Sequence, residues 1–245
     1  MKISVVVIAK NEEEMIADCL DSVRDFDEII LIDNGSRDRT SDIATHMGAK
    51  VVEYKSDDFS ILRNFGMTQA KGDFIFYIDA DERADAELIK NIKSNVILEN
   101  ISCLKVKRKN FYLGNHEWPK IEEIERVFKK EKFISWRGKL HESPSYEGGA
   151  KILDGFLNHY THRNLSQMLE KTIVWSDVEA KNRFESGHPK MALWRFPRVM
   201  ITTFFDYYVL QKGFKIGTAG LVESIYQSFS MLITYAKLWE LQNSK

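Results

Sequence analysis

The segment DFIFYIDADE, residues 73–82, joins a short apolar run to three acidic residues within four positions. The apolar part is rich in aromatic and β-branched residues and has the length of a strand that is buried on both faces. Because unpaired charges are costly to bury, Asp79, Asp81 and Glu82 are expected where this strand leaves the core. Such acids must face solvent, pair with cations or hold a metal ion.

Three strand-like runs come before this segment, and each is followed by a helical pattern. The runs are ISVVVIA (3–9), EIILID (28–33) and AKVVEY (49–54). The expected helices cover 12–23 with Asn11 as N-cap, 39–47, 59–72 closing on Gly72 as C-cap, and 84–100. Strands that alternate with helices predict right-handed βαβ units and a doubly wound, mainly parallel sheet.

The pattern changes after residue 100. The run CLKVKRKNFYL (103–113) alternates like a strand with one wet face. Short antiparallel strands and turns are expected over 125–148, and another strand over 151–162. The alternation places Lys105, Lys107, Arg108 and Lys109 mostly in solvent, with an anionic acceptor as the less favoured alternative. A helical extension is expected from Asn164, with one apolar face made of Leu165, Met168, Leu169, Thr172 and Ile173. We therefore predict an α/β domain over 1–163 and a helical extension over 164–245.

Bulk properties exclude several classes of protein. A chain of 245 residues is near the upper size of one hydrophobic core, and a net charge of −1 argues against a general nucleic-acid binder. Cys19 and Cys103 form neither a disulfide framework nor a metal-ligand spacing, which favours a reducing cytosol. The first apolar run is too short for a signal peptide, and no window is long and apolar enough to span a membrane. We expect a soluble protein, or one that sits on a membrane without crossing it.

Polar clusters follow three of the predicted strands. They are Lys10-Asn11-Glu12, Asp33-Asn34-Gly35-Ser36 and Asp79-Ala80-Asp81. In an open parallel sheet, ligands bind beyond the carboxyl ends of the strands, so the clusters are expected to form one site. Asp79 and Asp81 can both offer oxygens to a hard cation such as Mg²⁺, which usually takes one or two carboxylates and bridges to phosphates. The alternative, a solvated strand end or a helix cap, is less favoured beside the other two clusters.

The segments SVVVIAKNEE, EIILIDNGSRDRT and RNFGMTQAKGDFIFYIDADE, in that order, resemble the inverting family 2 glycosyltransferases of the GT-A fold. The later WRGKLHE and the helical C-terminal part resemble a bacterial subgroup associated with lipopolysaccharide core and envelope sugar transfer. The resemblance implies a nucleotide-sugar-binding half over 1–100 and an acceptor half over 101–163. Neither a P-loop nor a dinucleotide-binding glycine motif competes with it.

The resemblance also implies roles for individual residues. Ala9, Asn11 and Glu12 would lie along the nucleoside, with Asp33 at the base or ribose. Arg63 would lie near the nucleotide and its phosphates, and Asp79 and Asp81 would be the ligands of Mg²⁺ or Mn²⁺. Asp79 and Ala80 would also contact the donor. The sequence departs from the common pattern at Ala9-Lys10, where a proline is often found, and at Asn34, where an acid is usual.

The catalytic base is the least determined role. The family often uses the aspartate of a Glu-Asp pair, which this sequence lacks, so KLHESP offers the best substitute in Glu142, with His141 beside it. A structural polar pair is the alternative for both. Glu82 is a second candidate base, although a first-turn helix acid is a simpler role for it.

The resemblance implies transfer of a sugar, with inversion, from a nucleotide-diphosphate sugar (UDP-sugars favoured) to a glycan or lipid-linked acceptor. Two alternatives stay open, a polyprenyl-phosphate sugar synthase and a non-catalytic nucleotide-sugar-binding subunit. The segment from His188 to Lys245 carries seven basic and three acidic residues among large apolar ones. That composition fits a helix that lies on the anionic inner face of the cytoplasmic membrane. It fits equally a packed helical subdomain or a homodimer interface.

Overall fold

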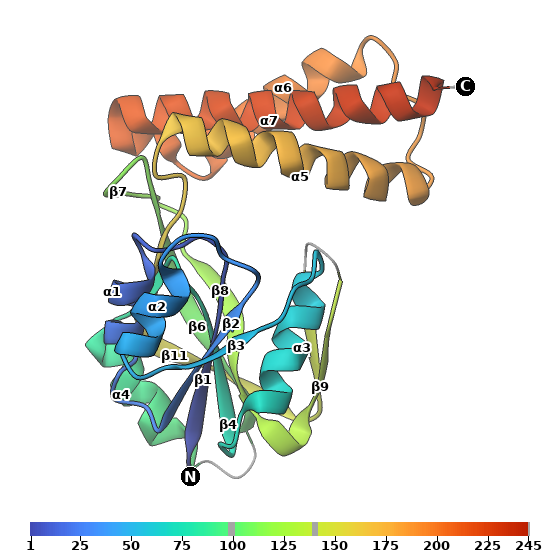
Figure 1. Ribbon diagram of the computed structural model, residues 1–245. Helices are drawn as coiled ribbons and strands as arrows, with labels where there is room; N and C mark the ends of the chain where they lie inside the picture. The colour runs from blue at the N-terminus through green and yellow to red at the C-terminus, as the bar shows by residue number, and fades with distance from the viewer. Residues whose placement is uncertain (98–100, 139–141, 245) are drawn as a thin grey trace. The chain divides into compact units, whose positions relative to one another are not determined.

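The computed structural model describes residues 1–97, 101–138 and 142–244 (Figure 1). It divides into two compact units, one formed by 1–109 with 122–159 and the other by 110–121 with 160–245. The elements that begin in the first unit are, in chain order, β1 (Ile3–Ala9), α1 (Ile16–Ser22), β2 (Glu28–Asp33), α2 (Thr40–His46), β3 (Lys50–Glu53), α3 (Phe59–Gln69), β4 (Phe74–Asp79), β5 (Glu82–Ala84), α4 (Ala86–Asn95), β6 (Ile101–Tyr112), β8 (Glu122–Lys129), η1 (Lys130–Lys132), β9 (Phe133–Arg137), β10 (Ser143–Tyr146) and β11 (Gly149–Tyr160).

The first unit is built on a mixed sheet with the strand order β3-β2-β1-β4-β8-β6-β11-β5. The strands β1, β2, β3 and β4 pair in parallel, as the alternation of strands and helices predicts. The later strands β8, β6, β11 and β5 add antiparallel pairs, and β9 and β10 form a separate hairpin. The predicted parallel sheet with short antiparallel strands is confirmed.

Register explains why the polar clusters meet. Ala9 at the end of β1 pairs with Asp33 at the end of β2, while the preceding Ile8 pairs with Asp79 at the end of β4. The three carboxyl ends therefore lie at one edge of the sheet.

Both faces of the parallel strands are buried, which accounts for their continuous apolar sequence. On β1, Val5 and Val7 belong to the core beneath α1, α2 and α4. Val6 and Ile8 belong to a second core with α3 and β9. The β1 strand thus separates two packed layers, with α3 and β9 on one side (Figure 1).

Two predicted helix caps are wrong. α1 begins after Met15, whereas Asn11 has a left-handed φ of 55° and lies in the turn beyond β1. α3 ends at Gln69 with Ala70 as C-cap. Gly72 instead lets the chain pass the backbone of β1, because a Cβ there would lie 2.7 Å from the Ser4 nitrogen. The predicted helix over 84–100 is observed from Ala86 to Asn95, and residues 98–100 lie outside the described part.

The second unit is helical. Its elements are β7 (His116–Glu117), which pairs with the end of β6, and α5 (Leu165–Glu185), α6 (Arg195–Phe205), the π-helical turn η2 (Asp206–Leu210), the 3₁₀ turn η3 (Gly213–Ile216) and α7 (Gly217–Asn243). The helices α5 and α6 both pack against α7. Among the described residues, no helix has the length and apolar character needed to cross a membrane.

The buried face of α5 is only partly the predicted one. Met168 and Thr172 are buried, and the Thr172 hydroxyl lies 2.8 Å from the Tyr226 hydroxyl of α7. Leu165, Leu169 and Ile173 are exposed, so only part of the predicted apolar face is buried. The packed face continues instead through Ser176 and Ala180, because small side chains at four-residue spacing let α7 approach closely.

One glycine of the first unit is required by both its conformation and its packing. Gly155 has φ of 91°, and a Cβ there would lie 2.2 Å from the Leu88 nitrogen. We expect Gly155→Ala to lower the free energy of unfolding by about 3 kcal/mol, from about 1–2 kcal/mol of backbone strain and about 1–3 kcal/mol of overlap. Gly48, with φ of 85° and no described atom within 4 Å of a Cβ, is the matched control. In urea denaturation, Gly48→Ala should lower the free energy of unfolding only by the cost of backbone strain. An equal decrease in the free energy of unfolding for both variants would refute the packing argument.

Candidate active site

The carboxyl ends of β1 and β2 form a polar edge that side-chain hydrogen bonds connect. One Asp33 oxygen accepts hydrogen bonds from the Ser36 nitrogen (3.0 Å) and hydroxyl (2.6 Å), and the other accepts from the Ser41 hydroxyl (2.8 Å). The Asn11 side chain accepts from the Arg37 nitrogen at 2.8 Å. These bonds fix the turn after β2 against the turn after β1.

Neighbouring residues complete this edge. The Ala9 carbonyl accepts from the Asn34 nitrogen at 2.9 Å, and the Glu12 nitrogen donates to the Thr40 hydroxyl at 2.8 Å. The Asn34 side chain forms a two-way bond with the backbone of Ser56, both distances being 3.0 Å. An amide is suited to that role because it donates and accepts at once, which an acid at this position would not do.

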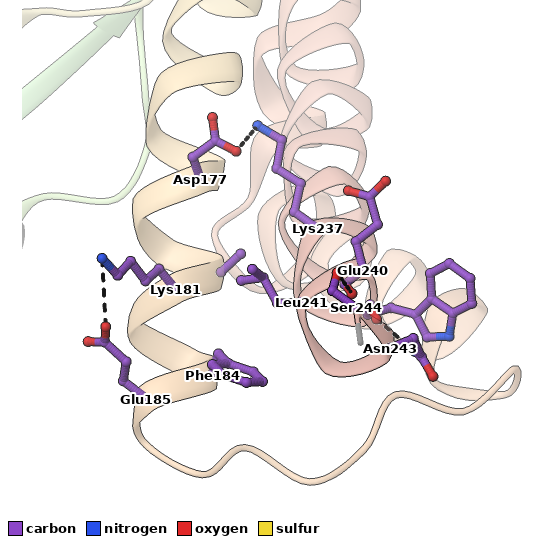
Figure 2. Close-up of a pocket in the computed structure, with 11 residues that line it drawn as sticks. Asp177, Lys181, Phe184, Glu185, Lys237, Glu240, Leu241, Asn243 and Ser244 are labelled. Carbon is purple, nitrogen blue, oxygen red and sulfur yellow. Dashed lines mark hydrogen bonds and ion pairs between the residues drawn. The ribbon is translucent and has the colours of Figure 1, made fainter.

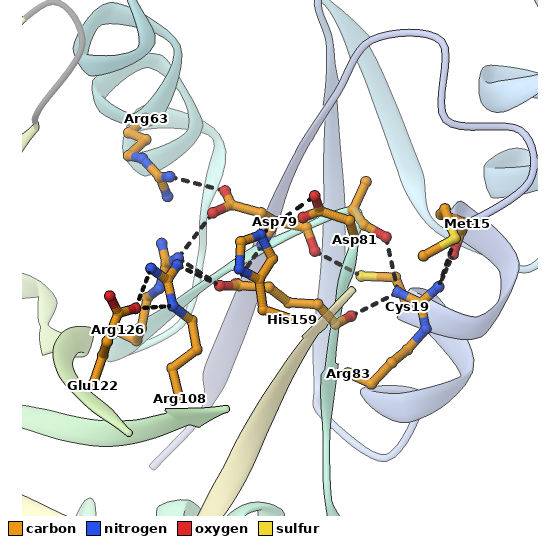
Figure 3. A network of polar contacts seen from close by, with 12 residues as sticks. Met15, Cys19, Arg63, Asp79, Asp81, Arg83, Arg108, Glu122, Arg126 and His159 are labelled. Atoms are coloured by element: carbon orange, nitrogen blue, oxygen red, sulfur yellow. Dashed lines mark hydrogen bonds and ion pairs between the residues drawn. The ribbon is translucent and has the colours of Figure 1, made fainter. Parts of the chain in front are cut away.

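Asp79 lies between two arginines at the end of β4 (Figure 3). Its Oδ1 accepts from Nη2 of Arg63 on α3, and its Oδ2 accepts from Nη2 of Arg126 on β8, both at 2.8 Å. Both arginines are buried, and the Arg63 guanidinium also lies 5.1 Å from the Trp136 ring centroid. The two charge-assisted bonds hold guanidinium groups from distant segments at the sheet edge.

The electrostatics of this cluster favour ionised groups. Burial alone would raise the pKa of Asp79, but the guanidiniums of Arg126 and Arg63 outweigh it and hold that pKa well below its ordinary value. Burial likewise opposes the charge of Arg126, yet the carboxylates of Asp79 and Glu82 raise its pKa. Asp79 therefore stays a carboxylate whose two oxygens are already engaged.

Glu82 is a fully buried carboxylate that binds members of this cluster. Its Oε2 accepts from the Asp79 backbone nitrogen at 2.9 Å, and its Oε1 accepts from Arg126 at 2.8 Å and Arg108 at 3.2 Å. Arg108 in turn binds Glu122 at 2.7 Å. Arg108 is therefore not a wet-face residue as predicted, and Glu82 lies in β5 rather than in a helix turn.

Asp81 follows the break between β4 and β5 and lies beside a histidine. An oxygen of Asp81 is 3.4 Å from Nε2 of His159, near the end of β11 (Figure 3). Burial disfavours a charge on His159, but the nearby Asp81 carboxylate outweighs it and raises the pKa of His159. A carboxylate oxygen and an imidazole nitrogen at this separation are donors that a divalent transition-metal ion accepts, with the proton as its competitor.

The turn between Asp79 and Asp81 is fixed from α1. Arg83 donates to the Ala80 carbonyl at 2.9 Å and to the Met15 carbonyl at 2.6 Å. The Cys19 thiol donates to the Asp79 carbonyl at 3.4 Å. Ala80 itself is buried, so its backbone, and not its side chain, shapes the site.

The two predicted catalytic residues follow the β9 strand. Glu142 is half-buried, and burial raises its pKa against the opposing charge of Arg63. Asp79 and Arg126 also act on this carboxyl, which places Glu142 within electrostatic reach of the cluster. His141 lies outside the described residues.

Sequence reasoning missed His159. It belongs to the predicted strand over 151–162, but only the pairing of His159 with Glu82 across β11 and β5 brings it beside Asp81. The sequence does not reveal which strand pairs with 151–162. A single histidine near the end of such a strand is therefore too weak a signal to predict a site residue. Sequence reasoning also missed the role of Arg126, which is a buried ion-pair partner of Asp79.

A surface pocket lies within the helical unit, between the second half of α5 and the end of α7 (Figure 2). Charged side chains on its wall pair with one another: Lys237 lies 2.7 Å from Asp177, and Lys181 lies 3.8 Å from Glu185. We assign no chemistry to it, and the sheet edge remains the candidate active site.

A comparison with known protein families identifies the family of this chain. Residues 4–153 match the family described as glycosyl transferase family 2. The chain belongs to glycosyl transferase family 2. An uncharacterised glycosyltransferase of Rickettsia typhi is 29% identical over 257 residues, which covers 98% of this chain and 87% of the relative.

Solved structures show the same fold at low identity. TarS of S. aureus, in complex with UDP-GlcNAc, has a TM-score of 0.51 and 14% identity, covering 98% of this chain and 89% of that one. Mannosyl-3-phosphoglycerate synthase of Rubrobacter xylanophilus has a TM-score of 0.50 and 15% identity, covering 78% and 76%. The GT-A fold that the sequence predicts for this family 2 glycosyltransferase is confirmed.

Proposed function

We propose that this family 2 glycosyltransferase is a metal-dependent inverting enzyme that moves a sugar from a nucleotide-diphosphate sugar to an acceptor hydroxyl. The observation that carries the proposal is the cluster at the sheet edge: Asp79 between Arg63 and Arg126, with Asp81 beside His159. It gathers cations for a diphosphate and donors for a metal at the carboxyl ends of parallel strands, where such folds bind ligands.

Glu142 is the proposed general base. It would take the proton of the acceptor hydroxyl while the acceptor oxygen forms a bond to the sugar's anomeric carbon. The bond from that carbon to the diphosphate oxygen breaks in the same step, and the nucleoside diphosphate leaves. A single displacement of this kind inverts the anomeric carbon. The raised pKa of Glu142 suits a base that must accept a proton readily.

Arg63 and Arg126 are proposed to bind the diphosphate. Within the described part of the chain, Nε and Nη1 of Arg63 and Nε of Arg126 are buried without a hydrogen-bond partner. Buried donors without partners are costly, and phosphate oxygens are strong acceptors for guanidinium groups. The Asp79 carboxylate would orient both side chains.

Asp81 and His159 are proposed to hold a divalent cation, Mg²⁺ or Mn²⁺. The predicted ligand pair Asp79 and Asp81 stays a proposal, and His159, 3.4 Å from the Asp81 carboxylate, is added to it as a further candidate ligand. A cation bound there would offset the negative charge that develops on the leaving diphosphate. His141, next to Glu142 in the chain, stays a predicted catalytic residue.

The donor is proposed to lie along the edge formed by Ala9, Asn11, Glu12, Asp33 and Ala80. The serine bonds to Asp33 would hold its carboxylate in place for a ribose or base contact. UDP-sugars are the first donors to test, since TarS, which shares the fold, was solved with UDP-GlcNAc.

The acceptor is proposed to be a glycan or a lipid-linked sugar of lipopolysaccharide or another envelope polymer, met at the inner face of the cytoplasmic membrane. This assignment derives from the sequence resemblance, as does the catalytic role of the domain predicted over 1–163. The extension over 164–245 is predicted from its helical pattern. A polyprenyl phosphate acceptor would need no strong base, so the importance of Glu142 separates that alternative from the main proposal.

Calorimetric titration tests the donor site directly. UDP, GDP and their common sugar conjugates should be titrated into the full chain with Mn²⁺ or Mg²⁺ and again with EDTA. We expect one nucleotide to bind with metal and to bind at least tenfold more weakly in EDTA, the range typical of weakened metal sites. No binding of any of them by folded protein would refute the proposed donor site.

A further inference from the structure

The helix α6 of the second unit presents an apolar face to solvent. Trp194, Ile201 and Phe205 are 55%, 68% and 51% exposed. They lie at intervals of seven and four residues, with Arg198 between them, and therefore on one side of the helix. All residues of α6 and its N-cap are described, and α6 itself contains no buried residue.

This arrangement differs from that in an ordinary surface helix, because large apolar side chains face solvent. A helix packed on a core turns its polar side outward, and contiguous exposed apolar patches mark interaction sites. The apolar character continues beyond α6, where Leu210 and Phe214 are 63% and 49% exposed. We call the exposed side chains of Trp194, Ile201 and Phe205 the α6 face.

The segment that contains the α6 face has an excess of basic residues. Between residues 190 and 216 the chain has five basic residues and one acid, Asp206, which accepts a hydrogen bond from Gln211 at 2.7 Å. The guanidinium carbons of Arg195 and Arg198 lie 5.0 and 5.6 Å from the Trp194 ring centroid. Cation–π contacts of this kind keep the arginines beside the aromatic ring. The basic residues are Lys190, Arg195, Arg198, Lys212 and Lys215.

We propose that the α6 face is a docking surface for an anionic lipid bilayer, on which α6 lies parallel to the membrane plane. Large apolar side chains beside basic ones match the acyl–headgroup boundary of such a surface, where aromatic rings enter the apolar layer and cations meet lipid phosphates. A second copy of the chain fits less well. A two-fold interface through this face would bring Arg195 and Arg198 of one copy close to the same two cations of the other.

The docking surface deepens the proposed envelope function, because it would bring the active site to a lipid-linked acceptor. It can be tested without any transfer reaction, so the two proposals can fail separately. The probe is sedimentation of the full chain with vesicles of phosphatidylcholine, with and without phosphatidylglycerol.

Two sets of variants locate the surface. Trp194→Ser with Ile201→Ser should weaken binding to the anionic vesicles by at least tenfold, since each removes a large apolar side chain from the contact. Arg195→Gln with Arg198→Gln should weaken it by about tenfold or more and reduce its sensitivity to salt. Ile173→Ser is the matched control, because Ile173 on α5 is 63% exposed, close to the value for Ile201. We expect that control to bind like the wild type.

Circular dichroism should confirm that each variant keeps its helices, and the arginine pair keeps the test decisive if the apolar variant unfolds. Three results would overturn the proposal. They are no preference of the wild type for anionic vesicles, an equal loss in Ile173→Ser, or concentration-dependent dimerisation that the Trp194 and Ile201 changes abolish.

Discussion

Asp81→Asn is expected to lower kcat on the order of a hundredfold or more at fixed metal concentration. The substitution keeps the shape of the side chain but removes the charge beside His159, and weakened metal sites commonly lose 10- to 100-fold in affinity or activity. Loss of charge compensation for the leaving diphosphate adds to that effect. Initial rates and nucleotide titration, each across a range of Mn²⁺ concentrations, measure both consequences.

Asp154→Asn is the matched control for this change. Asp154 is an exposed carboxylate paired with Lys107 at 2.7 Å, and exposed pairs contribute little. We expect its kcat and metal dependence to equal those of the wild type. If Asp81→Asn also kept the wild-type rate and metal dependence, the proposed metal ligand would be wrong.

Glu142→Gln is expected to lower kcat by about 10²- to 10⁴-fold and to leave the nucleotide dissociation constant unchanged. An amide cannot take the acceptor proton, and general-base catalysis contributes rate factors of that size. Single-turnover rates with donor and acceptor, together with calorimetry of the nucleotide, separate the two quantities. The exposed Glu147 in the same segment provides the control Glu147→Gln, for which we expect full activity.

The pH dependence gives an independent check on Glu142. Burial raises the pKa of Glu142, and the base must be ionised to act. The rate constant kcat/KM should therefore fall as the pH drops through this raised pKa, beginning at a higher pH than for an ordinary glutamate. Glu142→Gln should remove that limb from the profile. An unchanged acidic limb in the variant would assign it to another group.

The sequence predicts the parallel sheet because its signals are local. A strand such as Ile3–Ala9 is a continuous β-branched run, and the polar residues that follow it mark its carboxyl end. The rule that parallel strands end at one edge then brings Asp33 and Asp79 together, as the observed register does. Helix caps are less predictable, since Asn11 has the chemistry of a cap but lies in a left-handed turn.

The details of the site depend on partners that are far apart in the chain. Asp79 and its partner Arg126 are 47 residues apart. Alternation along β6 predicts that Arg108 faces solvent, because the pattern contains no information on its buried partner Glu82. For the same reason the sequence selects Asp79 and Asp81 together, whereas the structure pairs the first with arginines and the second with His159. Fold class follows from periodicity; ion-pair partners need the three-dimensional register.

The buried carboxylate of Glu82 has a consequence for mutational scanning. It binds the backbone of Asp79 and the side chains of Arg126 and Arg108, so its loss would leave buried charges unpaired and displace the neighbouring site. A scan scored by activity alone would rank Glu82 among the catalytic residues. Scoring each variant also for abundance would separate it from Glu142, whose conservative replacement should leave the amount of folded protein unchanged.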